Sequence, residues 1–278
     1  MTLHAFDGDD FAEVYRQLQR RLIEVYPTDV GQWQSQDVSS RPEMVTHELA
    51  NVSIVMGLPQ SAMVLADQTG AHLPWAEDHL QERVGGEPLN PAPSEAWWPF
   101  ASKKDGTTNT DHRMGVEFSH TYPERIWPKR AGDLNSPTSL DHLGVRFAYG
   151  DLQDVVNLLI KQPGTRQAFL PIWFPEDTGV VHGERVPCTL GYHFMIRNGE
   201  LQITYYMRSC DLIRHFQDDV YMAGRLAQWV RDELNNHLHN RAYDVGELVM
   251  HIVSLHCFAG DIDMMTKRDE EGDAWPTV

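Results

Sequence analysis

Cysteines, basic residues and long apolar runs are all scarce in this chain of 278 residues. The three cysteines include no Cys-x-x-Cys pair, which argues against a disulfide framework or a zinc knuckle and favours a reducing compartment. Lys and Arg number 23 against 40 Asp and Glu, a net charge of -17. That charge argues against a protein that coats nucleic acid, because phosphate backbones need a basic face. No apolar run approaches the roughly 20 residues of a membrane span.

The first residues also lack the basic and apolar regions of a signal peptide. We therefore expect a cytoplasmic protein that binds neither membranes nor nucleic acid. A nucleotide substrate stays possible, because it needs only a few local arginines. The histidines show no ligand spacing, so we expect no metal.

Apolar spacing predicts several helices and strands along the chain. The predicted helices cover residues 8–26, 73–85, 150–162 and 220–238. The predicted strands cover residues 48–59, 165–175 and 246–261, with a hairpin after Pro187. Residues 86–113, rich in Pro, Asn, Gly and Thr, predict a long ordered loop, with a flexible insertion as the alternative. Helices alternating with strands and one hairpin predict an α+β fold, in a single domain over residues 1–278.

The hairpin region, residues 185–220, gathers the residue types of a reactive site. Cys188 follows a proline at the head of the first strand, and Arg185 and Arg208 are cations that would favour its thiolate. A lone cysteine is nevertheless more often a small buried apolar residue. Arg208 and Ser209 close the second strand, and a guanidinium beside a hydroxyl is suited to a phosphate. Each arginine could instead be a surface ion-pair partner.

The remaining polar candidates lie on either side of the hairpin. Arg41 and Arg166 are further arginines suited to a phosphate, and His256 could bond a ribose hydroxyl. Asp219 could read a pyrimidine, because a protonated carboxyl donates to N3 of cytosine and accepts from the 4-amino group. Its alternative role is to cap the helix that begins there. Aromatic residues that could stack on a flat ring, or simply fill the core, are Trp97, Trp98, Tyr122 and Trp127.

Four segments together resemble the thymidylate synthase family, and more closely its hydroxymethylase branch. They are SHTYPERIW (119–127), GDLQDVVNLLIKQPGTRQAF (150–169), VPCTLGYHFMIRNGELQITYYMRSCDL (186–212) and VSLHCFAGD (253–261). The resemblance covers most of the chain after about residue 115. It implies the thymidylate synthase-like α+β fold, a mixed sheet packed with helices, and a homodimer formed through that sheet.

The resemblance also implies residue roles. Cys188 attacks C6 of the pyrimidine, and C5 then attacks the one-carbon unit of the co-substrate 5,10-methylenetetrahydrofolate. Arg208 and Ser209 hold the phosphate, and Arg166 reaches the partner's phosphate across the dimer interface. Further implied contacts are Asp211 with the folate, His256 with the sugar and Tyr122 near C5.

Departures from the family pattern direct the specificity. Gln167 stands where a second arginine is usual, and Phe258 replaces a sugar-contacting tyrosine. His215 to Asp218 replace a Gly-Leu-Pro-Phe stretch. Asp219 stands where the synthases place Asn, and the cytidylate hydroxymethylases resemble this chain in having Asp there. The catalytic glutamate corresponds either to Glu77 or to Glu82.

We therefore expect an enzyme that hydroxymethylates C5 of CMP or dCMP. Phe258 in place of the sugar-contacting tyrosine slightly favours CMP. Such enzymes serve nucleoside-antibiotic biosynthesis or phage DNA modification. The alternatives are a C5-methylase of a pyrimidine monophosphate and an inactive nucleotide-binding homologue.

Overall fold

The computed structural model describes residues 3–28, 32–33, 36–37, 39–99, 115, 118, 120–129, 150–179, 186–237 and 242–271. Arg185, at the start of the hairpin region, lies outside these residues, as does most of the predicted loop from residue 100 onwards.

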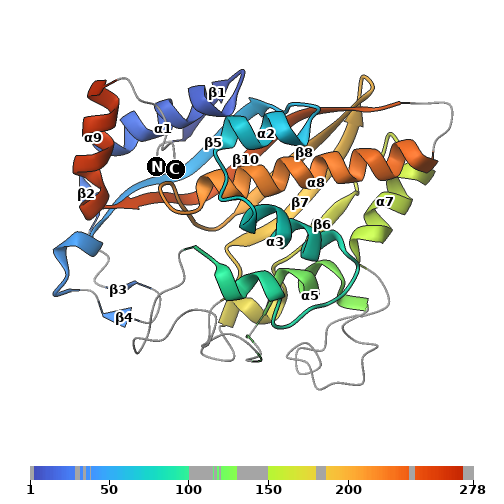
Figure 1. Ribbon diagram of the computed structural model, residues 1–278, viewed down its shortest axis with the longest axis horizontal. Helices are drawn as coiled ribbons and strands as arrows, with labels where there is room; N and C mark the ends of the chain where they lie inside the picture. Colours follow the sequence, from blue (N-terminus) through green and yellow to red (C-terminus); the bar gives the residue numbers. More distant parts are fainter. Residues whose placement is uncertain are drawn as a thin grey trace.

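One mixed sheet of eight strands forms the centre of the molecule (Figure 1). Its main path runs in the order β1 (His4–Gly8), β5 (Thr46–Gly57), β10 (Asp244–Phe258), β8 (Glu200–Met207), β7 (Thr189–Arg197) and β6 (Phe169–Pro171). The β1–β5 and β10–β8 pairs are parallel, and the other pairs on this path are antiparallel. Two short strands extend it: β2 (Pro27–Thr28) pairs with β5, and β9 (Cys210–Asp211) pairs with β10. A separate ladder joins β3 (Gln32–Trp33) to β4 (Gln36–Asp37).

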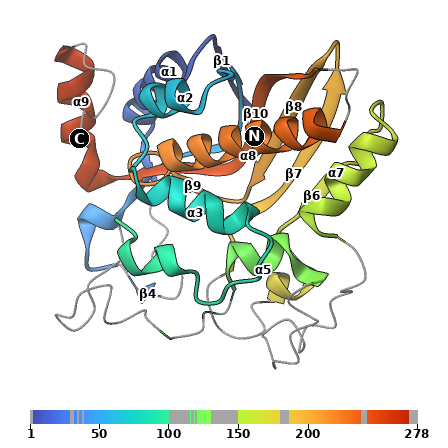
Figure 2. The same ribbon diagram turned by 45° about the vertical axis from the view of Figure 1, so that its right-hand side comes forward.

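The long helix α8 (Phe216–His237) crosses the sheet between α2 (Ala62–Thr69) and α3 (Trp75–Val84), as Figures 1 and 2 both show. Near the end of α8 lies α7 (Leu152–Lys161), while α1 (Phe11–Glu24) packs on α9 (Ile262–Glu271) beside β1. The five-residue helix α5 (Tyr122–Ile126) packs against α3. Short 3-10 turns are η1 (Pro42–Met44), η2 (Pro93–Trp97), η4 (Pro175–Gly179) and η5 (Ala259–Asp261). None of the described helices is both long and apolar enough to cross a membrane.

The hairpin of β7 and β8 has the local chemistry that its turn requires. Asn198 and Gly199 both have positive φ, +53° and +87°, which is the backbone of a two-residue turn between antiparallel strands. Gly191 lets β6 approach, because a Cβ there would lie 2.7 Å from the carbonyl oxygen of Leu170. The register shifts between Thr189 and Gly191, immediately after Cys188. The predicted nucleophile therefore stands at a local irregularity of the strand.

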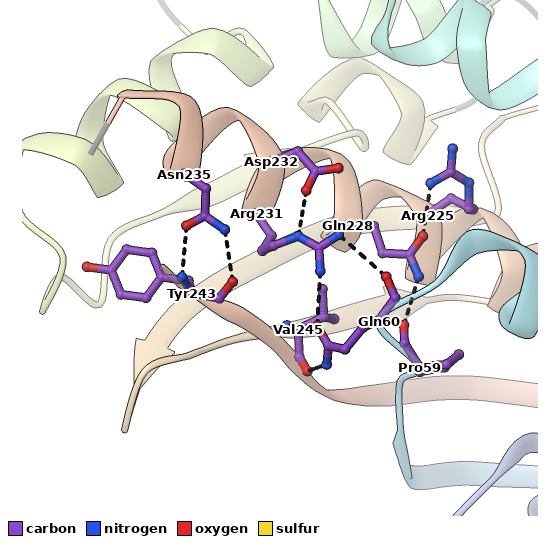
Figure 3. A network of polar contacts seen from close by, with 9 residues as sticks. All are labelled: Pro59, Gln60, Arg225, Gln228, Arg231, Asp232, Asn235, Tyr243 and Val245. Atoms are coloured by element: carbon purple, nitrogen blue, oxygen red, sulfur yellow. Dashed lines mark hydrogen bonds and ion pairs between the residues drawn. The ribbon is translucent and has the colours of Figure 1, made fainter. Parts of the chain in front are cut away.

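Polar side chains on one edge of α8 fix this helix to the sheet (Figure 3). Arg231 donates to Gln60 Oε1 at 3.0 Å, and Gln60 in turn bonds both the N–H and the carbonyl of Val245 at the start of β10. Asn235 exchanges two hydrogen bonds with the backbone of Tyr243. These contacts hold α8 in one position over the strands, so the first turn of the helix is placed reproducibly.

The predicted α+β fold is confirmed, with differences at particular elements. The first helix begins at Phe11, because Asp10 caps it by accepting from the N–H of Glu13, and it ends at Glu24, before Pro27. The predicted strand over 165–175 shrinks to three residues. The elements β1, α2 and α9 were not predicted; α2, for example, has only Leu65 and Thr69 buried and lacks a clear apolar stripe.

Candidate active site

Cys188 and Arg208 face each other across the two strands of the hairpin. The Arg208 N–H donates to the Cys188 carbonyl at 2.9 Å. Its guanidinium donates to the carbonyls of Pro187 at 2.8 Å and Val186 at 3.0 Å. A cation is thus fixed beside the peptides that carry the half-buried Cys188 thiol, as a reactive thiolate requires. A guanidinium has five N–H donors, so others remain for an anion beside Ser209.

Asp219 occupies the first turn of α8 but does not cap it. Its Oδ1 lies 3.4 Å from the Tyr205 hydroxyl, and its Oδ2 lies 3.6 Å from Cys210 Sγ. Burial raises the pKa of Asp219 to about 7, against the opposing effect of the Arg83 cation. The carboxyl is therefore in part protonated at neutral pH, the form that can donate to a base. Asp218, by contrast, bonds the backbone and ring of His72.

Tyr122 lies next to the residue that follows Cys188. The Thr189 hydroxyl is 3.2 Å from the Tyr122 hydroxyl, and the ring of Tyr122 carries the Arg83 guanidinium 4.0 Å from its centre. Burial raises the pKa of Tyr122, and the nearby Cys188 thiolate raises it further. The tyrosine is therefore a neutral donor and acceptor at physiological pH.

Arg83 is the residue of this cluster that sequence reasoning missed. It is only 5% exposed, and its buried Nε has no hydrogen-bond partner among the described residues. It interacts electrostatically with three tyrosines and with Asp219, and these partners raise its pKa despite the opposing effect of burial. The signal was present, because Arg83 continues the apolar face of α3 set by Ala76 and Leu80. A charge at such a position is expensive unless it is used.

The two candidate glutamates have different surroundings. Glu77 accepts from the Arg225 guanidinium at 2.9 and 3.1 Å and from the Tyr221 hydroxyl at 2.7 Å, across α3 and α8. Burial opposes its ionisation, but these bonds, with one from Gln81, outweigh burial and lower its pKa to about 2. Both oxygens of Glu77 are therefore committed to joining two helices.

Glu82 lies in a different group, close to Tyr122. It accepts from the N–H of Ser94 at 2.7 Å and from the Ser94 hydroxyl, and its Oε2 lies 3.6 Å from His79 Nδ1. Bonds from His79 and Ser94 outweigh burial and lower its pKa. The His79 ring meets the Tyr122 ring edge-on at 6.3 Å. Glu82 is the candidate glutamate that the described contacts link to the cluster around Tyr122.

Asp211 and His256 pair in register where β9 joins β10. The Asp211 carboxylate accepts from the N–H groups of Ile213 and Arg214 and from the Arg214 guanidinium, which also bonds Asp261. His256 is buried, which lowers its pKa, and it meets the Phe258 ring edge-on. One end of β10 therefore carries the neutral imidazole of His256 beside the Asp211 carboxylate, which Arg214 holds in place.

Of the two neighbouring tryptophans, Trp98 and not Trp97 makes the described ring contact. Trp98 stacks on His215 at 5.4 Å, just before α8, whereas Trp97 is 48% exposed at the end of η2. Trp127, the remaining aromatic candidate, is buried in the core, where its indole donates to the Arg83 carbonyl.

Arg41 and Arg166 lie at the surface. Arg41 precedes η1, which packs on η5 beyond the end of β10. Arg166 is exposed, as is Gln167, and its carbonyl contacts the His193 ring at 3.0 Å. The described contacts place neither arginine next to Cys188 of the same chain.

The described residues contain no group of three or more His, Cys, Asp or Glu placed to hold a metal ion.

The sequence model of the family described as Thymidylate synthase matches residues 89–273, about two thirds of the chain. The chain belongs to the thymidylate synthase family.

Two curated proteins are similar to parts of this chain. A "Deoxyuridylate hydroxymethyltransferase" of Bacillus phage SP01 is 29% identical over 141 residues, covering 46% of this chain and 34% of the phage protein. A "Putative thymidylate synthase" of Methanosarcina barkeri is 28% identical over 112 residues, covering 40% of this chain and 47% of the relative. The matched part therefore spans between a third and a half of each relative.

Proposed function

We propose that this protein transfers a one-carbon unit from 5,10-methylenetetrahydrofolate to C5 of CMP or dCMP and adds water, giving the 5-hydroxymethyl nucleotide. The observation that carries the proposal is Asp219. A carboxyl whose pKa is about 7 shares one cluster with Tyr122 and the residue next to Cys188. The family and the name of the phage relative support the reaction class.

Base selection follows from the protonation of Asp219. The protonated carboxyl donates to N3 of cytosine and accepts from its 4-amino group, whereas uracil presents a donor at N3 and an acceptor at position 4. A bound uracil would leave buried donors and acceptors without partners, which costs binding free energy. Asp219 therefore favours cytosine, and in this it differs from the base that the phage relative's name specifies.

Nucleophilic attack is assigned to Cys188. Its thiolate, favoured by Arg208, adds to C6, and the electron pair of the C5–C6 double bond moves to C5. The proton of Asp219 passes to N3 and neutralises the developing charge. Arg208 and Ser209 anchor the phosphate, so the ring is held against the thiol.

The residues present suit a folate. The Trp98–His215 stack offers a flat aromatic surface at the start of α8, and Asp211 provides a carboxylate fixed by Arg214. When bound, the folate supplies the one-carbon unit at the oxidation level of formaldehyde. Glu82 then orients the water that completes the hydroxymethyl group. The sugar stays open between ribose and deoxyribose, although Phe258 removes one hydroxyl contact.

Release of tritium from 5-tritiated CMP, dCMP, UMP and dUMP in the presence of the folate tests this function. We expect release from a cytidine nucleotide, loss of release in Cys188→Ala, and retention in the control Cys257→Ala, which removes a thiol from β10 instead. Release from uridine nucleotides alone would contradict the base assignment. Accumulation of dihydrofolate would indicate a methylase, and no release from any of the four would indicate an inactive homologue.

A further inference from the structure

A continuous line of hydroxyl groups joins Tyr122 to Asp219. Thr189 Oγ1 lies 3.2 Å from the Tyr122 hydroxyl and 2.8 Å from the Tyr205 hydroxyl, and Tyr205 lies 3.4 Å from Asp219 Oδ1. The four groups come from α5, β7, β8 and α8, so four separate elements converge to build the line. Thr189 has no exposed surface and Tyr205 is 1% exposed. A buried chain of this kind is specific and costly to leave incomplete.

The line can carry a proton in either direction because each hydroxyl both donates and accepts. When Asp219 is ionised, each O–H points towards the carboxylate. When Asp219 is protonated, each points towards Tyr122. Passing one proton along the line converts the first arrangement into the second, and no oxygen retains a charge at the end. This matters because burial makes a free phenolate unfavourable at Tyr122 and Tyr205, raising the pKa of both.

Charged and titratable neighbours of the line come from several elements. They include Arg83 and His79 on α3, Cys188 just before β7, Tyr192 on β7, Cys210 on β9 and Asp218 on α8. Arg83 is the cation among them, and it lowers the pKa of Tyr122 and Asp219 against the effect of burial. A fixed buried cation beside the line stabilises the partial negative charge of a proton in transit. This gives a use to a guanidinium whose Nε lacks a hydrogen-bond partner among the described residues.

We propose that Thr189 and Tyr205 form a proton relay that returns the C5 proton of the nucleotide from Tyr122 to Asp219. The proposal rests on the proposed function, because a C5 proton leaves only if C5 is substituted. Asp219 gives its proton to N3 when Cys188 adds to C6. Later the C5–H bond breaks, its electron pair forms the C4–C5 double bond and neutralises the protonated C4–N3 imine, and the proton enters at Tyr122. The N3 proton is lost to water when Cys188 leaves C6 and the C5–C6 double bond re-forms. Tyr122, Thr189 and Tyr205 each pass on one proton, and Asp219 is protonated again.

Thr189→Val tests the relay, with Thr189→Ser as the matched control. Valine keeps the shape of the side chain and removes the hydroxyl, whereas serine keeps the hydroxyl. We expect Thr189→Val and Tyr205→Phe to slow tritium release at least about tenfold, while the Kd for CMP stays within about twofold of wild type. Thr189→Ser should keep most of the rate. The solvent isotope effect on release, which reports several protons in motion, should fall in Thr189→Val and Tyr205→Phe and stay near the wild-type value in Thr189→Ser.

A second measurement is independent of turnover. The infrared carbonyl band of protonated Asp219, assigned by its disappearance in Asp219→Asn, should shift in Thr189→Val and stay in place in Thr189→Ser. An unshifted band together with wild-type release in Thr189→Val would overturn the relay. Equal slowing in Thr189→Val and Thr189→Ser would overturn it too. If the proposed function fails, the wild-type protein releases no tritium from CMP or dCMP. The infrared comparison still shows whether the Thr189 hydroxyl is coupled to the Asp219 carboxyl.

Discussion

At the scale of single residues, protonation of Asp219 is the feature that connects the structure to the proposed base specificity. Its carboxyl lies among Tyr205, Cys210 and Arg83, and burial outweighs the cation to give a pKa of about 7. Because this pKa is raised above the ordinary value, the protonated form dominates below pH 7 and is lost as the pH rises through 7.

Asp219→Asn should exchange the preferred base. A carboxamide donates to O4 and accepts from N3–H of uracil, so the ratio of tritium release from CMP to release from UMP should fall by about 10²-fold or more. In the wild type, release from CMP should decrease above pH 7, and in the variant this decrease should disappear. Rates with both nucleotides from pH 6 to 9 measure both effects. An unchanged base preference would contradict the role of Asp219.

Residue types alone indicated Cys188, Arg208 and Asp219, because a thiol can be a nucleophile, a guanidinium can hold a phosphate and a carboxyl can pair with a base. Arg83 and Tyr205 were not predicted. Arg83 lies on the apolar face of α3, but its contact with Tyr122 appears only once α3 is packed, and Tyr205 matters only because the β7–β8 register sets its hydroxyl beside Thr189. Such contacts join elements far apart in sequence, and no local pattern contains them.

At the scale of elements, α3 carries the two glutamates on different sides. Glu77 points to Tyr221 and Arg225 of α8, while Glu82 points to Ser94 of η2 and His79. They are five positions apart, so they leave the helix in different directions. Sequence spacing left the two equivalent, and the packing of α3 on α8 separates them. The helix thus has one glutamate that joins it to α8 and one that the described contacts link, through His79, to Tyr122.

Glu77→Gln and Glu82→Gln should therefore differ in their effects. Glu77→Gln should lower the free energy of unfolding by about 1–2 kcal/mol at neutral pH and leave product formation nearly unchanged. Because the Glu77 pKa is lowered to about 2, its contribution is present above its ordinary value and is lost as pH falls towards 2. The stability difference from wild type should shrink accordingly. Glu82→Gln should slow formation of 5-hydroxymethyl nucleotide about 10²-fold. Chemical denaturation and mass spectrometry give the two quantities; equal loss of product in both variants would contradict the assignment.

At the scale of the whole molecule, the sheet has one face under α8 and one face that stays partly accessible. Side chains alternate along strands, and on β10 the residues His251 and Val253 are exposed, with Val253 at 53%. Phe169 on β6 is 44% exposed and lies near His193, whose ring contacts the Arg166 carbonyl. Exposed apolar side chains such as Val253 and Phe169 on a sheet face are typical of a surface that binds a partner. The alternation of β7, β8 and β10 predicted a sheet, but the open face emerged only from where the helices pack.

This face and the exposed Arg166 beside it support the homodimer that the family resemblance implies, with Arg166 reaching the phosphate site of the partner. Arg166→Ala and Cys188→Ala should each be inactive alone. Mixed after unfolding and refolding together, they should regain about a quarter of wild-type activity, because half of the dimers are mixed and each has one site with both residues intact. Arg197→Ala mixed with Cys188→Ala is the control. Arg197 donates to the carbonyl of Ile196 in its own strand, so the Arg197→Ala variant should be fully active before it is mixed. No recovery in the Arg166 mixture, at a protein concentration where sedimentation shows dimers, would mean that Arg166 acts within its own chain or not at all.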